Sequence, residues 1–345
     1  MVIQHRVMPY ASNNLTGESY FSGATLDDLM CDVLEELLSH GEPTNPSQGP
    51  CKELRGVLLE LTSPRSRISR TETRGKPFSC LGELCWYLAQ SNELEFIRYY
   101  IKQYEDSADG DVVKGGYGPR LFRWRQVEQL DNVIETLRTK LDSRQAVIQL
   151  FDASDLAESH KSIPCTCTLQ FMLRGGQLHM VTSMRSNDAY IGLPHDIFCF
   201  TMLLEIIART LSVDVGIYKH AVGSLHLYDR NIDGAKQFLG EGVQSTTSPM
   251  PRMPEGDPWP AIRVLIEAEK VIRTNQLFDN RLIENIDPYW ADLARLLQVY
   301  RFSKDNDCDQ IADVRGKMAS STYEVFIDQR LSECRKRLME SHEKA

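Results

Sequence analysis

The sequence lacks the features that mark several large classes of protein. Its 345 residues include 39 basic and 48 acidic side chains, a net charge of −9, and no lysine- and arginine-rich run. A general binder of nucleic-acid backbones carries a basic stripe, so that class is excluded, although a pocket with a few arginines can still bind a small anion. The longest apolar runs are too short to span a bilayer, and residues 1–14 contain no signal-peptide core. We therefore expect a cytoplasmic protein that binds neither nucleic acid nor membranes.

Cysteine is present without a pattern. The nine cysteines show no CxxC pairs and no cluster with histidine, so the sequence predicts reduced thiols and no bound metal. With 42% hydrophobic residues, the chain can bury a substantial core as one large domain with appendages or as two domains. No internal repeat and no low-complexity tract is present.

The first half of the chain predicts helices and strands in alternation. Thr25 with Asp28 forms a capping signal for a helix that Gly41 ends. Residues 54–62 predict a strand, and 79–104 predict one or two helices. An amphipathic pattern over 126–141 predicts a helix, and residues 145–152 predict a buried strand.

The second half has the clearest local signals. Two alternating runs flank Gly175 and Gly176, a pattern typical of a two-residue β-hairpin. Residues 197–211 are apolar on nearly every side and predict a buried helix, and 216–231 predict a strand that bends at Gly223. A proline-, serine- and threonine-rich connector over 244–260 then leads to polar-faced helices.

Two residues are candidates for catalysis. Cys165 precedes a predicted strand, and a nucleophilic cysteine needs a lowered pKa; taken alone, such a residue is more often a buried, inert thiol. Glu83 lies within an otherwise apolar helix, where a carboxylate is costly unless it is paired or hydrogen-bonded.

Five further polar residues lie at the ends of predicted strands. Arg185, Ser186 and Asp188 directly follow one strand, and taken alone they would form a solvated turn. His226 and Tyr228 are two residues apart on another strand, so both face the same side. A hydrogen-bonded core histidine is the usual explanation of such a pair.

The order of these weak signals is informative. From about residue 45 to 240, the chain resembles the thymidylate synthase superfamily. Within it, "CTCTLQ", "MRSND" with a downstream aspartate, and "VGSLH" look most like the deoxycytidylate hydroxymethylases. The matching pieces, in chain order, are "GELCWYL", "GGYG", "DSRQ", "PCTCTLQF", "RSNDAYIGLPHD" and "VGSLHLY".

The resemblance implies an α/β (α+β) fold whose large mixed β-sheet forms the interface of a homodimer. Residues 45–240 would be the catalytic domain, 1–44 an N-terminal helical extension, and 241–345 a linker with a C-terminal helical segment. Arg144 would reach across the interface into the partner's site.

The resemblance also implies a covalent mechanism. Cys165 would add to C6 of a pyrimidine nucleotide, and C5 would then attack the methylene carbon of 5,10-methylenetetrahydrofolate. Glu83 would organise water for proton transfer and Tyr117 would assist removal of the C5 proton. Hydroxymethylases add water to the resulting exocyclic methylene group, whereas thymidylate synthases add hydride.

The remaining implied roles are binding roles. Arg185 and Ser186 would hold the phosphate, and His226 and Tyr228 would bind the sugar. Three residues are implied at the folate: Trp86, Gly192 and Asp188. Asp188 would also contact the base.

Asp196 is expected in the first turn of the helix that follows "GLP", at the position that reads the base. Thymidylate synthases have asparagine there, whose amide matches the O4 and N3–H of uracil. A carboxylate matches the amino group of cytosine together with a protonated N3. The sequence therefore favours a cytosine nucleotide over dUMP. An ordinary first-turn carboxylate, favoured by the helix dipole, is the alternative.

Several departures from the family pattern keep other functions open. Gln48 stands where a phosphate-binding arginine is expected, so Arg65, Arg67, Arg70 or Arg74 would have to substitute, and Gln145 replaces a second arginine. The tryptophan-rich folate segment and the closing C-terminal motif are missing, which favours water over hydride as the final reactant. The alternatives are a divergent thymidylate synthase acting on dUMP and a nucleotide-binding protein without turnover.

Overall fold

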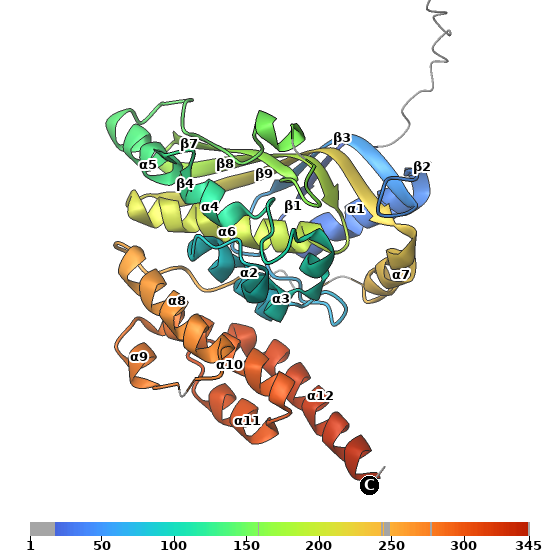
Figure 1. Cartoon of the computed structure of the whole chain (residues 1–345), viewed down its shortest axis with the longest axis vertical. Helices are drawn as coiled ribbons and strands as arrows, with labels where there is room; N and C mark the ends of the chain where they lie inside the picture. The colour runs from blue at the N-terminus through green and yellow to red at the C-terminus, as the bar shows by residue number, and fades with distance from the viewer. Residues whose placement is uncertain (1–17, 158, 243, 245–248, 277, 344–345) are drawn as a thin grey trace, which may run out of the picture.

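The computed structural model describes residues 18–157, 159–242, 244, 249–276 and 278–343. Residues 1–14, where we expected no signal peptide, and part of the predicted connector lie outside these ranges. Figure 1 shows a β-sheet, a layer of helices against one of its faces, and a group of C-terminal helices beyond that layer.

The large mixed sheet that the sequence predicted is present, with seven strands. Neighbours β1 and β3 are parallel, as are β9 and β8, whereas the other pairs in the sheet are antiparallel. The order is β1 (Tyr20–Gly23), β3 (Cys51–Leu61), β9 (Asp214–Tyr228), β8 (Gln177–Asp188), β7 (Thr166–Arg174) and β6 (Val147–Gln149), with β2 (Glu42–Thr44) also on β3. A separate ribbon pairs β4 (Arg123–Trp124) with β5 (Val127–Glu128).

The predicted hairpin is confirmed. Arg174 pairs with Gln177, and the two glycines between them have φ angles of +57° and +77°. Two successive positive φ angles match the twist of the flanking strands, and only glycine adopts them without strain.

The helices that precede residue 241 lie on one side of the sheet, some against it and others one layer further out. They are α1 (Leu26–His40), α2 (Pro77–Leu88), α3 (Leu94–Tyr100), α4 (Tyr117–Phe122), α5 (Gln129–Thr139), α6 (Gly192–Thr210) and α7 (Ile232–Gly240). The capping box of Thr25 and Asp28 is formed, and α1 ends at Gly41 as predicted. Helix α6 is buried along most of its length between the sheet and α2, which confirms the predicted buried helix.

Helix α6 starts earlier than predicted, at Gly192 rather than near 197. Pro194 lies in its first turn, where a backbone N–H has no helical partner, so proline is tolerated there. Asp196 therefore does not lie in the first turn, which contains no acidic residue. The dipole explanation for this carboxylate is correspondingly weaker.

Two predicted strand boundaries are also wrong. Only Val147–Gln149 of residues 145–152 form a strand, because the N–H groups of Leu150 and Phe151 both donate to the Cys167 carbonyl and end the ladder. Arg185, Ser186 and Asp188 lie within β8 and not after it, because parallel pairing with β9 continues to Asp188.

Residues 20–44, predicted as part of an N-terminal extension, contribute β1 and β2 to the main sheet, and α1 packs on β3. The C-terminal helices are α8 (Trp259–Arg273), α9 (Arg281–Glu284), α10 (Pro288–Asp305), α11 (Cys308–Gly316) and α12 (Glu324–Glu343). The domain boundaries themselves stay a prediction.

The C-terminal helices pack against α2 and α3 on the side that faces away from the sheet (Figure 1). The Tyr100 hydroxyl donates to Glu269 of α8 at 2.8 Å, and the Tyr300 hydroxyl of α10 donates to the Tyr99 carbonyl at 3.0 Å. These helices thus stabilise the part of the fold that carries Glu83.

The prediction of nine reduced thiols is wrong for two of them. Cys308 and Cys334 form a disulfide between α11 and α12, with Cα atoms 5.9 Å apart, which is within the usual range. Across the described residues, no helix combines the length and the apolar character needed to cross a bilayer.

Candidate active site

One cavity collects most of the predicted site residues. It has a volume of about 720 Å³ and lies at the end of the sheet where β8 and β9 finish, with walls from α2, α4, α6 and the loops around residues 44–48 and 155–163. The predicted residues that line it are Glu83, Trp86, Tyr117, Cys165, Arg185, Ser186, Asp188, Gly192, Asp196, His226 and Tyr228. The fold therefore unites side chains that are up to 145 positions apart (83 to 228).

Cys165 immediately precedes β7 and is half-buried. Burial raises the pKa of its thiol, whereas the nearby Arg185 guanidinium lowers it. Arg185 Nη2 lies 3.7 Å from the sulfur, and Arg185 Nε also donates to the Pro164 carbonyl at 3.0 Å. The arginine is thus fixed beside the sulfur and stabilises the thiolate once it forms.

Tyr117 lies next to the nucleophile. Its hydroxyl oxygen accepts hydrogen bonds from the backbone N–H of Thr166 at 3.1 Å and from the Thr166 hydroxyl at 3.0 Å. The ring packs against Tyr87 and Phe200, with centroids 5.3 and 6.1 Å away. Its hydroxyl proton is therefore free to point into the cavity.

Glu83 is the centre of a hydrogen-bond cluster and is only 4% exposed. One oxygen accepts from the hydroxyl groups of Tyr87 at 2.9 Å and Tyr104 at 2.6 Å. The other lies 2.7 Å from His195 Nδ1. Burial alone would raise the pKa of Glu83, but these hydrogen bonds and the His195 charge hold it below its usual value.

His195 was not predicted. Burial favours the neutral imidazole, but the Cys80 thiol and Glu83 together raise the pKa of His195 to about 10. Its Nε2 lies 3.4 Å from the Ser79 hydroxyl, so both ring nitrogens have partners on α2. The signal in the sequence was the adjacent pair "HD" at the start of an otherwise apolar helix.

Asp196 contacts a second residue that sequence reasoning missed. Asn187 Nδ2 donates to Asp196 Oδ2 at 2.6 Å, and the Asn187 Oδ1 atom is buried without a hydrogen-bond partner among the described residues. Burial, reinforced by the charge of Glu83, raises the pKa of Asp196 to about 8. Burial thus favours the neutral carboxyl form, which can both donate and accept a hydrogen bond.

The ends of β8 and β9 place the predicted sugar- and phosphate-binding residues side by side. Ser186 pairs with Ser224, and Asp188 pairs with His226. The rings of His226 and Tyr228 meet edge to face at 4.8 Å, which confirms that both face one side. Asp188 Oδ1 accepts from the N–H of Tyr190 at 2.8 Å and fixes the turn that leads into α6.

Trp86 and Gly192 also line the cavity. Trp86 is fully buried, and its indole N–H has no hydrogen-bond partner among the described residues. The ring packs against Tyr104 with centroids 5.3 Å apart. This donor lies in the wall of the cavity and is buried from solvent.

Arg144 is the predicted site residue that the fold does not bring to the cavity. It is exposed in the loop before β6, and its backbone carbonyl accepts a hydrogen bond from Gln170 at 3.1 Å. None of the four arginines considered as substitutes at Gln48 lines the cavity either. Arg67, for example, is fully buried in an ion pair with Glu205.

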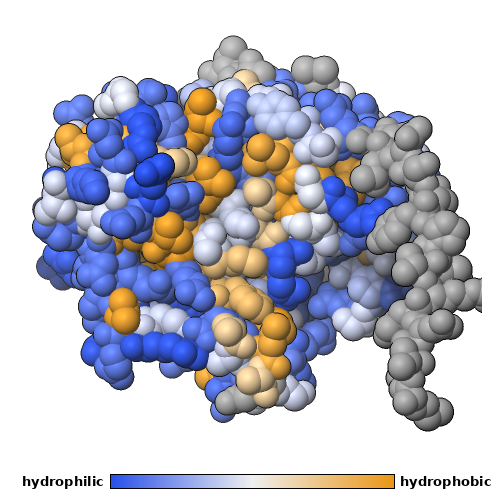
Figure 2. All heavy atoms as spheres, turned by 90° about the horizontal axis from the view of Figure 1, so that it is seen from above, coloured by the Kyte–Doolittle hydropathy of each residue, from blue (hydrophilic) through white to orange (hydrophobic). Residues whose placement is uncertain are grey.

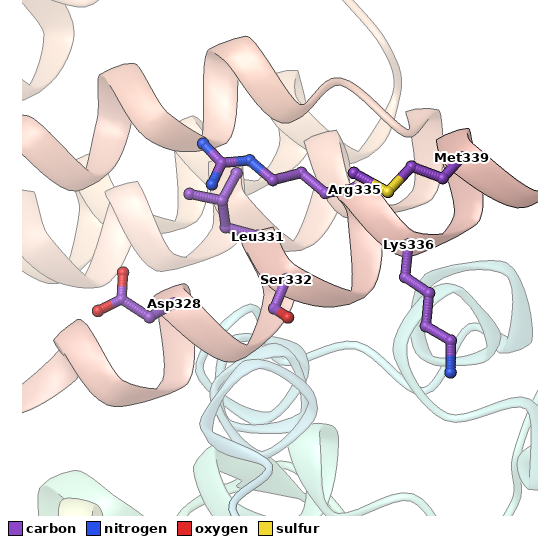
Figure 3. Close-up of a pocket in the computed structure, with 6 residues that line it drawn as sticks. All are labelled: Asp328, Leu331, Ser332, Arg335, Lys336 and Met339. Carbon is purple, nitrogen blue, oxygen red and sulfur yellow. The ribbon is translucent and has the colours of Figure 1, made fainter.

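A second hollow lies along one face of α12 and contains none of these residues (Figure 3). Its lining comes from a single helix: Asp328, Leu331, Ser332, Arg335, Lys336 and Met339. Among the described residues, no group of three or more histidine, cysteine or acidic side chains is arranged to hold a metal ion.

The chain is similar in sequence to proteins of known family. The family model described as Thymidylate synthase matches residues 66–254. The chain is 31% identical over 223 residues to a deoxyuridylate hydroxymethyltransferase of Bacillus phage SP01, covering 60% of this chain and 58% of the relative. It is 33% identical over 165 residues to a deoxyuridylate hydroxymethyltransferase of Pseudomonas phage M6, covering 46% of each. The chain thus spans about half the length of the curated relatives it matches.

The fold has a solved counterpart. The crystal structure of thymidylate synthase from T4 phage superposes with a TM-score of 0.53 at 20% identity, covering 62% of this chain and 81% of that one. At that identity the similarity speaks for the fold alone. It confirms the fold class that the sequence predicted.

Proposed function

Because this chain belongs to the thymidylate synthase family, whose model covers residues 66–254, we propose that it transfers a one-carbon unit to C5 of a pyrimidine nucleotide, and that the nucleotide carries cytosine. The product would be a 5-hydroxymethyl nucleotide. The observation that carries the choice of base is a carboxyl group, Asp196, which is hydrogen-bonded to Asn187 and lies in the same cavity as Cys165 and Glu83.

Asp196 is suited to the edge of cytosine. A neutral carboxyl group accepts a hydrogen bond from the exocyclic amino group and donates one to N3; the same pair can be written as a carboxylate with a protonated N3. Asn187 holds one carboxyl oxygen in place at 2.6 Å. The base edge would therefore meet a fixed and buried partner.

Cys165 would act as the nucleophile. Its thiolate would form a bond to C6 of the ring, and the electron pair of the 5,6 double bond would move to C5, which becomes nucleophilic. Arg185, with Nη2 3.7 Å from the sulfur, would stabilise the thiolate before attack and again when the C6–S bond breaks.

Glu83 and Tyr117 would handle the protons. The Glu83 carboxylate is held ionised by its partners, so it can orient water and accept a proton through it. Tyr117 lies within the same group of packed rings, with a centroid 5.3 Å from that of Tyr87. Its free hydroxyl proton would face the reacting ring.

The residues present fit the co-substrate that the family uses. When bound, 5,10-methylenetetrahydrofolate supplies a one-carbon unit at the oxidation level of formaldehyde. The buried indole N–H of Trp86 has no hydrogen-bond partner among the described residues and would donate to its polar ring system. Asp188 and Gly192 line the same wall near the start of α6.

Water is the final reactant that we favour. Glu83, His195, Tyr87 and Tyr104 form a polar cluster in the cavity wall that can hold a water molecule against the reacting carbon. The relatives described above are named hydroxymethyltransferases. No described residue after Arg230 lines the cavity, so the described parts of the C-terminal helices do not close it.

A second candidate substrate is deoxyuridylate, because both relatives are named for it. A protonated Asp196 could donate to O4 of uracil and accept from N3–H, as an amide does. Uracil would lose this match when the carboxyl group ionises, because a carboxylate repels O4.

We further propose that the active form is a homodimer in which Arg144 enters the partner's cavity. The sheet face away from α6 carries partly exposed hydrophobic side chains on four neighbouring strands, and Figure 2 shows hydrophobic residues across this side of the molecule. These residues are Leu58, Met172, Val181 and Ile217. Arg144 is exposed, and its guanidinium makes no hydrogen bond or ion pair to the described residues.

The test is a product analysis. The protein would be incubated with 5,10-methylenetetrahydrofolate and dCMP, CMP or dUMP, and the nucleotide mass and the released folate would be measured. We expect a hydroxymethyl group on a cytosine nucleotide, together with tetrahydrofolate. A methyl group with dihydrofolate would indicate a thymidylate synthase, and binding without product would indicate a protein without turnover.

Two cysteines provide a matched pair for this assay. Cys165→Ala should abolish turnover, whereas Cys167→Ala should retain it, because Cys167 lies two residues further along, within β7, and does not line the cavity. Equal loss in both variants would argue against a covalent role for Cys165.

A further inference from the structure

Arg230 lies at the edge of the cavity, just past the end of β9 in the short helix η3 (Asp229–Asn231). Its guanidinium stacks over the Tyr228 ring at 4.0 Å from the centroid. Its Nη1 donates to the Gln48 carbonyl at 2.8 Å, and the Tyr228 hydroxyl donates to the Gln48 side chain at 3.4 Å. This arginine is therefore held against the loop that contains Gln48 by its stacking on Tyr228, by its own hydrogen bond to Gln48, and by the hydrogen bond between Tyr228 and Gln48.

Most of the hydrogen-bonding capacity of Arg230 is unused. A guanidinium has five N–H donors, and within the described part of the chain only the Gln48 contact uses one. No carboxylate among the described residues forms an ion pair with Arg230, and the side chain is exposed. A positioned arginine with free donors and no counter-charge is suited to bind an anion.

Arg185 differs from Arg230 in this respect. Its Nε and Nη2 donate to the carbonyls of Pro164 and Ile163 at 3.0 and 3.2 Å, besides the contact of Nη2 with the Cys165 sulfur. Arg185 is thus tied to the nucleophile. Arg230 has more free donors for an anionic group of the substrate.

We propose that Arg230 binds the terminal phosphate of the molecule that occupies the cavity, with Gln48 as its fixed support and with Arg185 and Ser186 completing the anion site. The inference rests on the proposed function in that the occupant is taken to be a nucleotide. Two guanidiniums and a hydroxyl group suit a phosphate monoester, which carries up to two negative charges and three terminal oxygens. Such a site would favour a nucleoside monophosphate over the corresponding nucleoside.

The test is a binding measurement on the full chain without folate. Isothermal titration calorimetry would compare dCMP, deoxycytidine and inorganic phosphate on the unmodified protein, Arg230→Gln and Arg230→Lys. Loss of charge-assisted hydrogen bonds should weaken dCMP and phosphate binding about 10- to 100-fold in Arg230→Gln. Arg230→Lys should fall between, because lysine keeps the charge but loses the fork geometry. Deoxycytidine binding should not change.

Arg263→Gln is the matched control, because Arg263 is exposed on α8 and does not line the cavity. It should bind all three ligands as the unmodified protein does. Equal weakening of dCMP and deoxycytidine by Arg230→Gln, or no change in dCMP binding, would overturn the proposal. The binding measurement does not depend on turnover. If the protein binds phosphate through Arg230 but makes no product in the separate product analysis, the proposed function is refuted and the role of Arg230 is not.

Discussion

Glu83 and His195 form an ion pair in the wall of the cavity, with His195 Nδ1 2.7 Å from Glu83 Oε2. Glu83 lies on α2 and His195 on α6, 112 positions later in the chain. The imidazolium and two tyrosine hydroxyls occupy both carboxylate oxygens, so the glutamate is fixed in position and kept ionised. The acid-base group that the sequence predicted is therefore a pair and not a single residue.

Replacing His195 by phenylalanine should raise the pKa of Glu83. The aromatic ring retains much of the volume but removes the positive charge and one hydrogen bond, and burial then dominates. We expect the acid limb of the kcat profile to move upward by about one pH unit or more. Rates of turnover between pH 4 and 9 would measure the shift.

Ser79→Ala serves as the control, because the Ser79 hydroxyl lies 3.4 Å from His195 Nε2, the ring nitrogen that does not contact Glu83. Its acid limb should stay close to that of the unmodified protein. If His195→Phe lowers kcat equally at every pH, His195 is a structural residue and the pair does not set the ionisation of Glu83.

Asp196→Asn should move the base preference from cytosine toward uracil. Asn187 donates to one carboxyl oxygen, so it would hold the new amide with its oxygen on that side and its NH₂ donor on the other. An NH₂ group matches O4 of uracil and opposes the amino group of cytosine. We expect the ratio of kcat/KM for dCMP to that for dUMP to fall by about 100-fold or more. An unchanged ratio would contradict our assignment of Asp196.

The same substitution should stabilise the fold in a pH-dependent way. The pKa of Asp196 is about 8 in the folded protein against an ordinary value of 3.8, so the folded state holds a proton that the unfolded chain has released. The stability that this proton provides is complete below about pH 4 and is lost as pH rises toward 8. Asparagine has no such dependence. The gain in unfolding free energy of Asp196→Asn should thus increase from pH 5 to pH 8.

Urea unfolding at pH 5, 6.5 and 8 would measure this gain. Asp142→Asn is the control, because the Asp142 side chain is 93% exposed. Its effect on stability should be small and nearly independent of pH. A gain for Asp196→Asn that does not grow with pH would show that the carboxyl group is already ionised in the folded protein.

Local signals in the sequence predicted local structure well. The Thr25 cap and the hairpin at Gly175 and Gly176 depend on neighbouring residues and formed as expected. The position of Cys165 before β7 and the burial of Glu83 also followed from short patterns. Such features need only propensity and periodicity.

Contacts between distant segments could not be predicted in this way. The partner of Glu83 is 112 positions away, and the Cys308–Cys334 disulfide depends on how α11 packs against α12. Arg230 reaches Gln48 across 182 positions because β9 runs back beside β3, next to the loop that contains Gln48. The start of α6 was misjudged because a proline in a first turn looks like a helix breaker.

Gly82→Ala tests how closely α2 must approach α3. A Cβ atom at Gly82 would lie 2.2 Å from the Tyr100 ring, so either the ring or the helix must move. Overpacking of this kind costs about 1–3 kcal/mol, and movement of α2 would displace the neighbouring Glu83. Thermal unfolding and kcat should both fall. Gly240→Ala, where a Cβ meets nothing within 4 Å, should leave both unchanged.

Mixing two inactive variants would test whether Arg144 serves the partner's cavity. Cys165→Ala lacks the nucleophile, and Arg144→Ala lacks the arginine that would cross the interface. In a mixed dimer, the cavity of the Arg144→Ala subunit keeps its own Cys165 and receives Arg144 from the Cys165→Ala subunit. After denaturation and refolding together, half of the dimers are mixed and each has one complete site, so activity should return to about a quarter of the unmodified level.

If Arg144 served its own subunit, each variant would contain only defective sites and the mixture would stay inactive. Refolding each variant alone controls for recovery of activity by the procedure itself.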